Sequence, residues 1–550
     1  MKKVGKIIAL ILCLVMVFSL ASCGGKKADS DSASNTPSNT NTEEKENNTV
    51  DYNVSNEGEG TTQDISEMEH SDAVSARDTL TIATSGDNGT LNPSKIIGGF
   101  VGIVRQYMET LVDFNADGTM VYLLATDIEQ SETEWIVHLR EGVTFSNGNP
   151  FNADDVMFTL NYYCTDPTLG MTFGAINLEG CEKIDDYTVK IALNTYSAML
   201  IGSFSQFYLY DAESFDENDV VLNPIGTGPY KIEDYVINSH VDLVANENYW
   251  GEKPKIQHLH YKILNEDAQV VNALEAGEVD IAAVPAQDRD YVAGMSKYNS
   301  MSYYTVFTPT VQFNLYSTVL DSVEARMAVC YALDRQAICD LVYFGNATVL
   351  DYPVSMHSLD YTEDLANLHD TYATGHDLEK AQEYADKAGI VGKTVTIITN
   401  GASTYVAEAE MLQSDLKKIG VEAKIVNYDS ATYWTASADP NNFDIALYAA
   451  ASPQCYAVGT IYEYVLWSPS VYGAWDRYQE YIDLGAQAVS NPDPEARKEY
   501  LKTMSEMFEE EIPWFGICDQ MNTVAVNKDL AGVEIWNSGI MHLCDWYWTA

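Results

Sequence analysis

Alternating apolar and polar positions predict β-strands in the first half of the chain. The stretches 79–84, 135–139 and 187–193 place β-branched or apolar residues at about every second position, which buries one face of a strand. A Gly-Asp-Asn-Gly loop at 86–89 follows the first of these strands.

Helical spacing is clearer in the second half. Asp321 and Glu324 have the spacing of a capping box, and the apolar positions that follow predict one helix that is closed by Gly345. A second helix is expected over 403–419, between strand-like stretches that lie just before and just after it. This strand–helix–strand order is typical of a βαβ unit with two parallel strands, so the pattern indicates an α/β fold.

The N-terminal region has a different pattern. Three lysines precede an apolar run from Ile7 to Phe18, which is too short for a spanning helix of about 20 residues. A basic start, a short apolar centre and small residues near the exit are typical of a secretory signal. The ending Leu-Ala-Ser-Cys resembles the bacterial lipobox, in which the cysteine receives a diacylglyceryl group. Residues 1–23 are therefore expected to be a lipoprotein signal peptide, with lipid attached to Cys23.

Residues 24–78 show no periodicity and contain Tyr52 as their sole aromatic residue. Ser, Asn, Thr, Asp, Glu and Gly dominate the segment, so it has too little apolar surface to offset the entropy of ordering. We expect a disordered tether that spaces the folded part from the membrane.

The charge balance is strongly acidic. The chain has 31 basic and 81 acidic residues, a net charge of −50, and most of the excess lies after residue 78. Nucleic-acid binding and close contact with anionic lipid both need basic patches, so neither partner is expected. Nine cysteines occur without any Cys-x-x-Cys spacing, which gives no indication of a zinc ribbon or a redox motif.

Three short motifs approach known binding sites without completing them. At 392–394 a Gly-Lys-Thr triplet lies before a strand, whereas a phosphate loop lies after a strand and before a helix. The stretch 113–118 matches the first half of a calcium loop, but the position of the final Glu ligand is occupied by Leu124. His258 and His260 would share one side of a strand, which a polar strand face also explains. Neither Gly-x-Ser-x-Gly nor His-Glu-x-x-His occurs. We expect no metal, no cofactor and no enzymatic activity.

Several sequence blocks resemble a known family in composition and order. The chain is similar to the family 5 extracellular solute-binding proteins of ABC importers, the oligopeptide- and dipeptide-binding group. The resemblance covers nearly the whole folded part and rests on the blocks 91–93, 108–112, 139–148, 150–156, 226–230, 248–251, 274–280 and 331–335.

This resemblance implies a bilobed fold like that of periplasmic binding proteins, with hinged lobes and three domains. It implies a monomer at the extracytoplasmic face of the membrane that encloses a small molecule or peptide between its lobes and delivers it to the permease subunits. The implied domains are domain I at 79–103, 200–305 and 523–550, domain II at 104–199, and domain III at 306–522.

One departure from the family concerns the ligand's amine. Peptide-binding members commonly carry an Asp just after the strand that corresponds to 443–448, and here 449–459 contains no acidic residue. A buried ammonium without a partner costs several kcal/mol. Either Asp87 or Asp429 supplies the pairing, or the ligand has no free amine.

Two ligand classes therefore stay open, an oligopeptide and a neutral oligosaccharide or similar solute. The 36 Tyr and 9 Trp residues favour the second class, because sugars stack on aromatic faces. A surface hydrolase and a sensory lipoprotein are alternatives of other classes. By resemblance, the expected ligand contacts are Asn88, Phe307, Tyr433, Trp434, Tyr448, Ser452, Tyr456 and Trp514.

Overall fold

The computed structural model describes most of the chain after the N-terminal region. The predictions for the signal peptide with Cys23, for nearly all of the tether and for Ser452 lie outside the described residues. These residues are 76–96, 101–114, 120–166, 169–350, 352–358, 360–361, 365, 375–450, 456–491, 493–534 and 543–549.

The largest sheet of the described chain has β1 at its centre, parallel to both of its neighbours. Leu80 and Ile82 of β1 are buried in the core, as their alternation predicts. The sheet runs in the order β12 (Tyr298–Tyr304), β19 (Cys518–Asn527), β11 (Ile281–Val284), β1 (Thr79–Thr84), β10 (His258–Ile263), β9 (His240–Ala245) and β8 (Tyr230–Val236), and β14 (Ala347–Val349) pairs with β19.

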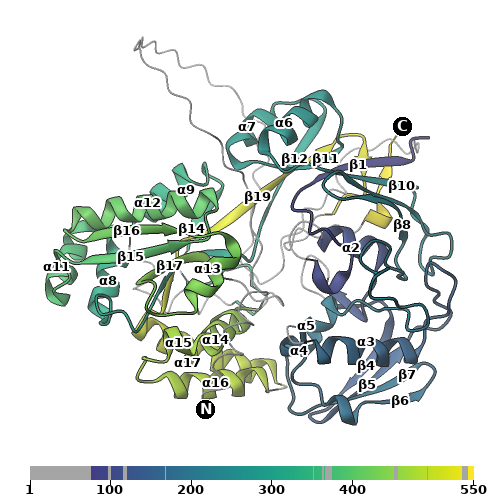
Figure 1. Cartoon of the computed structure of the whole chain (residues 1–550), viewed down its shortest axis with the longest axis horizontal. Helices are drawn as coiled ribbons and strands as arrows, with labels where there is room; N and C mark the ends of the chain where they lie inside the picture. The colour runs from purple at the N-terminus through teal and green to yellow at the C-terminus, as the bar shows by residue number, and fades with distance from the viewer. Residues whose placement is uncertain are drawn as a thin grey trace.

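A four-stranded antiparallel sheet lies below the largest sheet in Figure 1. Its two predicted strands are confirmed, and they pair with each other. Asn152 caps the helix beside this sheet in a reciprocal capping box with Asp155. The strand order is β4 (Ala125–Gln130), β5 (Glu134–Leu139), β7 (Thr188–Ala192) and β6 (Glu182–Asp185), with the helix α3 (Ala153–Thr165) and the hairpin β2 (Val112–Phe114) and β3 (Met120–Tyr122) nearby.

Other short elements complete this half of the molecule. They are α2 (Val101–Tyr107), α4 (Leu169–Thr172), α5 (Leu200–Ser203), α6 (Asp267–Ala276), α7 (Arg289–Ala293), β20 (Leu530–Ala531) and β21 (Tyr547–Trp548), with 3-10 turns at Pro93–Lys95, Leu178–Gly180, Phe204–Gln206, Ala286–Asp288 and Leu543–Asp545.

A five-stranded sheet with helices on both sides forms the green and yellow-green half of Figure 1. The predicted βαβ unit is confirmed, because β15 and β16 are parallel and α12 connects them. The sheet order is β16 (Glu422–Asn427), β15 (Thr394–Thr399), β17 (Ile445–Ala450), β13 (Thr308–Phe313) and β18 (Trp514–Gly516). Its helices are α8 (Val323–Ala332), α9 (Arg335–Leu341), α11 (Leu378–Ala388), α12 (Ser403–Lys418), α13 (Ser430–Ser437), α14 (Ala457–Trp467), α15 (Pro469–Tyr472), α16 (Tyr478–Val489) and α17 (Pro494–Glu511).

The prediction of one helix opened by Asp321 is wrong in two respects. The N-cap of α8 is Ser322, whose hydroxyl accepts a hydrogen bond from Ala325 N. The helix then breaks before Asp334, which caps a separate helix, α9, by accepting from Ala337 N. The Asp334 side chain, which competes for a backbone donor, therefore divides a stretch whose apolar periodicity is continuous.

Two of the three hydrophobic cores among the described residues define two lobes, and the smaller third core contains residues of α6, α7 and the largest sheet. One continuous core lies between the largest sheet and the four-stranded sheet, which together make up the first lobe. The second core surrounds the five-stranded sheet and makes up the second lobe. The expected bilobed α/β fold is confirmed by this arrangement (Figure 1). Among the described helices, none combines the length and the hydrophobicity that a bilayer crossing requires.

Candidate ligand site between the lobes

The backbone crosses between the lobes at two adjacent places, which we call the hinge (residues 304–309 and 517–520). The first crossing joins β12 to β13, and the second is the N-terminal half of β19. Hydrogen bonds tie the crossings together, from Thr305 N to Gln520 O at 3.3 Å and from Ile517 N to Pro309 O at 2.8 Å. The Gln520 side chain also donates to Phe307 O at 3.3 Å.

β19 belongs to both lobes. Cys518 of this strand is part of the second core, whereas Val524 and Val526 are part of the first. The strand pairs with β14 through 518–520 and with β11 and β12 through its later residues. A single extended strand therefore connects two independently packed cores, which is the arrangement expected of a hinge.

Buried polar atoms collect at the hinge. Asp519 is 1% exposed; its carboxyl accepts from Met356 N at 3.2 Å and interacts with the Ser355 side chain, whereas its Oδ1 has no hydrogen-bond partner among the described residues. Thr308 Oγ1 and His357 Nε2 are likewise buried without a described partner. The imidazole of His357 stacks on Tyr304, with 4.3 Å between ring centroids. The hinge thus presents an acceptor, a hydroxyl and an imidazole nitrogen whose hydrogen-bonding capacity is unused.

Burial also perturbs the titration of this group. Burial raises the pKa of the Asp519 carboxyl to about 7 and lowers the pKa of the His357 imidazole to about 4. At neutral pH the imidazole is therefore neutral, and the carboxyl is close to its titration midpoint. Such perturbed groups often mark functional sites.

Four of the predicted contact residues come together in the second lobe. Tyr433 and Trp434 on α13 pack against each other at 5.1 Å, and Trp434 lies 5.7 Å from Tyr448 on β17. Tyr464 on α14 stacks on Tyr448 at 5.8 Å and lies 6.0 Å from Trp514 on β18. We call these five residues the aromatic cluster. Helices and strands far apart in sequence thus bring predicted residues into one group.

The aromatic cluster is buried within the second core. The exposed fractions are 0% for Tyr433, 4% for Trp434, 7% for Tyr448 and 0% for Trp514. The Trp514 indole donates to Pro353 O at 2.9 Å, whereas Trp434 Nε1 has no partner among the described residues. Packing therefore occupies most ring faces, and the role of these residues as ligand contacts stays a prediction.

The other predicted contacts lie apart from one another. Asn88 is in the loop after β1 in the first lobe, Phe307 is half-buried at the hinge, and Tyr456 is the N-cap residue of α14. Ser452 lies outside the described residues. The roles of these residues as ligand contacts also stay predictions.

Both carboxylates proposed as amine partners already accept hydrogen bonds. Asp87 accepts from Gly89 N at 2.7 Å and from the Tyr235 hydroxyl, so it holds its own loop against β8. Asp429 caps α13 by accepting from Thr432 N at 3.1 Å and from the Thr432 hydroxyl at 2.6 Å. Each carboxylate therefore stabilises local structure, and each also carries a negative charge that could pair with an amine.

A third carboxylate, Asp360, was not found from the sequence. It accepts from Val458 N at 3.0 Å and from Ala457 N, so it lies at the first turn of α14. This turn lies at the end of the segment 449–459, which contains no acidic residue of its own. Burial raises the pKa of Asp360. Because 97 positions separate Asp360 from Ala457, no local sequence signal places it there.

The lobes also touch at a second place, which we call the closing contact (Ala198, Met199 and Val489). Ala198 N donates to Val489 O at the end of α16, at 2.6 Å. Met199 precedes α5 in the first lobe, yet it is 7% exposed and belongs to the second core. The two lobes are therefore joined by the hinge and also by a contact that involves no covalent crossing.

Comparison with known proteins decides what this architecture is. Residues 119–458 match the model of the bacterial extracellular solute-binding proteins, family 5. This chain belongs to that family. The expectation drawn from the sequence blocks is thus confirmed, and the match spans more than half of the chain.

Individual relatives agree with the assignment. The di/tripeptide-binding protein 1 of Pseudomonas aeruginosa is 28% identical over 400 residues, which are 64% of this chain and 72% of the relative. The dipeptide-binding protein of Escherichia coli is 25% identical over 520 residues, 84% and 93% of the two chains. The crystal structure of NikA from Brucella suis in complex with Fe(III)-EDTA has a similar fold, with a TM-score of 0.76 at 21% identity over 86% of this chain and all of NikA.

Family membership sets the general function of this family 5 protein. Its relatives are substrate-binding transport proteins of ABC importers and not enzymes, so the expectation of no enzymatic activity is confirmed. They act outside the cytoplasm and pass a bound solute to a permease. The relatives named above differ in the solute that they bind.

Proposed function

We propose that this family 5 protein captures a short peptide between its lobes and delivers it to the permease of an ABC importer. The observation that carries the proposal is the set of buried, unpartnered polar atoms around the hinge and the aromatic cluster. Asp519 Oδ1 is an acceptor and Trp434 Nε1 is a donor, and each unpaired buried group costs about 1–3 kcal/mol. A peptide backbone supplies both N–H and C=O groups, so it can satisfy both kinds of atom.

The aromatic cluster weakens the case for an oligosaccharide. Sugars need ring faces that are open to the ligand, and the four predicted aromatic contacts in this cluster are no more than 7% exposed. Tyr448 is stacked on Tyr464, and Trp434 packs between Tyr433 and Tyr448. The names of the two peptide-binding relatives support the same choice. We therefore place the peptide first.

Isothermal titration of the purified protein tests the proposal. Dipeptides, tripeptides, the same peptides with N-acetyl groups, neutral oligosaccharides and a metal chelate form the ligand panel. We expect heat with the free-amine peptides and none with oligosaccharides. Binding of an oligosaccharide or a chelate with no peptide binding would overturn the proposal. Turnover of any ligand would contradict a pure binding function.

Three charge-neutralising variants identify the amine partner. Asp360→Asn, Asp87→Asn and Asp429→Asn each remove a negative charge and keep one of the two oxygens that accept the local hydrogen bonds. Loss of a buried partner costs about 3–5 kcal/mol, so affinity for free-amine peptides should fall at least 100-fold in one variant. Affinity for N-acetylated peptides should not change. If all three variants bind normally, the amine has another partner.

We also propose that lipid on Cys23 holds the protein at the membrane, with 24–78 as the tether. Two or three acyl chains give stable anchoring, since each buried CH₂ contributes about 0.8 kcal/mol. The Cys23→Ala variant should leave the membrane fraction, and mass spectrometry should find no lipid on it.

Size-exclusion chromatography tests the expected monomer, and limited proteolysis tests domain boundaries at about 104, 200 and 306. Deletion followed by uptake of labelled solute distinguishes import from sensing.

A further inference from the structure

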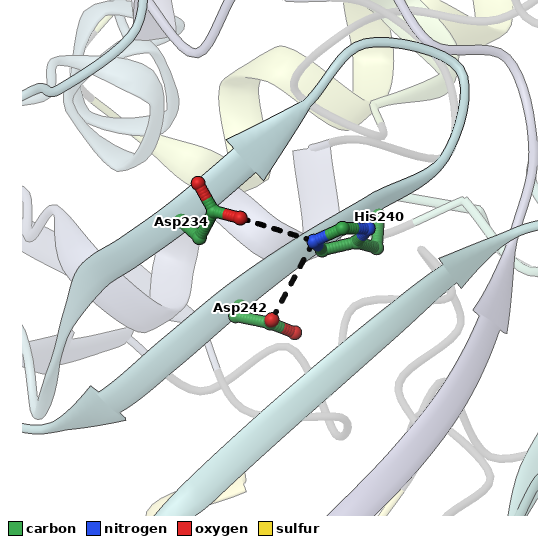
Figure 2. Close-up of side chains that lie close together, drawn as sticks. All are labelled: Asp234, His240 and Asp242. Atoms are coloured by element: carbon green, nitrogen blue, oxygen red, sulfur yellow. Dashed lines mark hydrogen bonds and ion pairs between the residues drawn. The ribbon is translucent and has the colours of Figure 1, made fainter.

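A group of histidine and aspartate side chains lies at the edge of the largest sheet that is opposite the hinge. β8, β9 and β10 form this edge, whereas β12 lies at the other end of the sheet. Val241 and Leu243 of β9 are buried in the core, so the alternation of the strand directs its neighbours to the other face. Asp234 of β8 and His240 and Asp242 of β9 come together there, as Figure 2 shows.

The spacing of the three side chains suits a tetrahedral metal ion. His240 Nε2 lies 3.2 Å from Asp234 Oδ2 and 3.6 Å from Asp242 Oδ2. Zinc bonds to nitrogen and oxygen are about 2.0–2.1 Å long, so two ligand atoms of a tetrahedral site lie about 3.3 Å apart. One ligand atom from each of the three residues lies within 4.8 Å of the other two. Small side-chain adjustments therefore bring all three atoms to one ion.

Neighbouring side chains orient the potential ligands. Without metal, His240 Nε2 donates to Asp234 Oδ2 at 3.2 Å; when zinc replaces this proton, Nδ1, which lies 3.0 Å from Ser239 Oγ, carries the remaining ring proton and donates it to that hydroxyl. His260 on β10 binds Asp242 Oδ1 through its Nδ1, while the other oxygen of Asp242 faces His240. Partners of this kind, behind the ligands, are typical of protein metal sites.

Electrostatics also favours a cation at this place. Asp234 and Asp242 are direct cross-strand partners, and like charges at such positions destabilise a sheet. The nearest lysine in the register, Lys262 opposite His240, is paired with Glu278. A divalent cation between the two carboxylates removes their repulsion even when the imidazole is neutral.

We propose that Asp234, His240 and Asp242 bind one Zn²⁺ ion, with water as the fourth ligand and His260 as the residue that positions Asp242. One imidazole with two carboxylates suits zinc better than calcium or magnesium, which take oxygen ligands only. The site is exposed at Asp234, which leaves the fourth position open to solvent. The expectation of no metal is revised by this proposal.

The bound ion cross-links β8 and β9 next to their connecting turn. That turn carries Asn238, whose backbone N–H donates to Asp87 in the loop after β1. Zinc therefore stabilises the edge of the first lobe and the loop beside it. The stoichiometry of zinc and its effect on Tm are measured without a transported ligand, so this function is tested separately from the proposed peptide binding.

Titration of the metal-free full-length protein with ZnCl₂ tests the proposal. The protein is first treated with a chelator, and calorimetry measures stoichiometry and affinity while thermal unfolding measures the shift of Tm. His240→Ala and Asp242→Asn should each remove one zinc equivalent and its Tm shift. His260→Ala should keep the stoichiometry and weaken affinity about 10- to 100-fold. His138→Ala is the matched control, because His138 pairs with Glu129 at 2.9 Å on another sheet.

The outcomes are distinct. Loss of one equivalent in His240→Ala and Asp242→Asn, with normal circular dichroism and no change in His138→Ala, supports the site. Equal stoichiometry and affinity in wild type, His240→Ala and Asp242→Asn overturns it, and so does the absence of zinc binding by wild type. The peptide affinity of wild type is measured in parallel, so failure of the zinc site leaves the transport proposal standing.

Discussion

The hinge and the closing contact both join the lobes, but they are built in opposite ways. At the hinge, β19 extends through both lobes and pairs with strands on each side. At the closing contact, one described backbone hydrogen bond and the Met199 side chain make the connection. A hinge must persist while the lobes open, whereas a closing contact must break on every cycle. The difference teaches that extensive pairing marks the permanent junction and sparse packing marks the reversible one.

The largest expected effect concerns packing beside the hinge. Trp514 precedes the second crossing, is fully buried and packs on Phe508 at 4.4 Å. Trp514→Ala should lower the free energy of unfolding by about 3–5 kcal/mol, as is usual for a buried tryptophan. Urea denaturation measures the loss. Trp514→Phe separates packing from ligand contact: a peptide affinity lowered without loss of stability would favour the sequence-based assignment of Trp514 as a ligand contact.

The second effect concerns the buried carboxyl at the hinge. Burial raises the pKa of Asp519 to about 7, above its value in the unfolded chain. Its contribution to stability is therefore fully present below about pH 4 and is lost as the pH rises through 7. Asp519→Asn should match wild type near pH 4 and exceed it by a few kcal/mol at pH 8. Thermal unfolding across this pH range measures the difference.

A buried carboxyl away from the hinge provides the control for Asp519. Burial raises the pKa of Glu408 to about 8, and the Tyr343 hydroxyl donates to it at 2.6 Å within the second core. Glu408→Gln should also stabilise the protein at high pH. Only Asp519→Asn should change the ligand-induced compaction seen by solution scattering. Equal scattering changes in both variants would argue against a special role for the hinge carboxyl.

The third effect concerns the closing contact. Met199→Ala removes packing that exists only when the lobes meet, so it should weaken ligand affinity about tenfold while Tm changes little. Met327→Ala is the matched control, because Met327 is 8% exposed in the same core but lies wholly within the second lobe. It should lower Tm and leave affinity unchanged. The reverse pattern would show that Met199 serves packing and not closure.

The smallest effect concerns a single hydrogen bond. Ala198→Pro removes the N–H that donates to Val489 O, and the net loss is about 0.5–1.5 kcal/mol. Ligand affinity should fall about two- to tenfold, whereas Ala198→Gly, which keeps the N–H, should bind like wild type. Calorimetry with the peptide identified above measures both. No change in Ala198→Pro would mean that Met199 alone maintains the closing contact.

Local sequence pattern predicted the parts of the fold that local interactions determine. Alternation located β1, β5 and β7, and helical periodicity with flanking strands located the β15–α12–β16 unit. The family followed from sequence blocks in a fixed order, and with it the two-lobed architecture. The prediction of one helix over 321–345 was wrong, because helix capping by Ser322 and Asp334 depends on their polar side chains and cannot be inferred from the spacing of apolar residues.

The candidate sites depended on contacts between residues that are distant in sequence. Asp360 reaches α14, Met199 enters the core of the other lobe, and Asp234 meets Asp242 across a hairpin. Hydrophobic spacing and composition alone determined the fold class, the acidic character and the expected signal and tether. Only the tertiary structure decided which polar atoms are buried without partners and which charges face each other, because those energies depend on where separate segments meet.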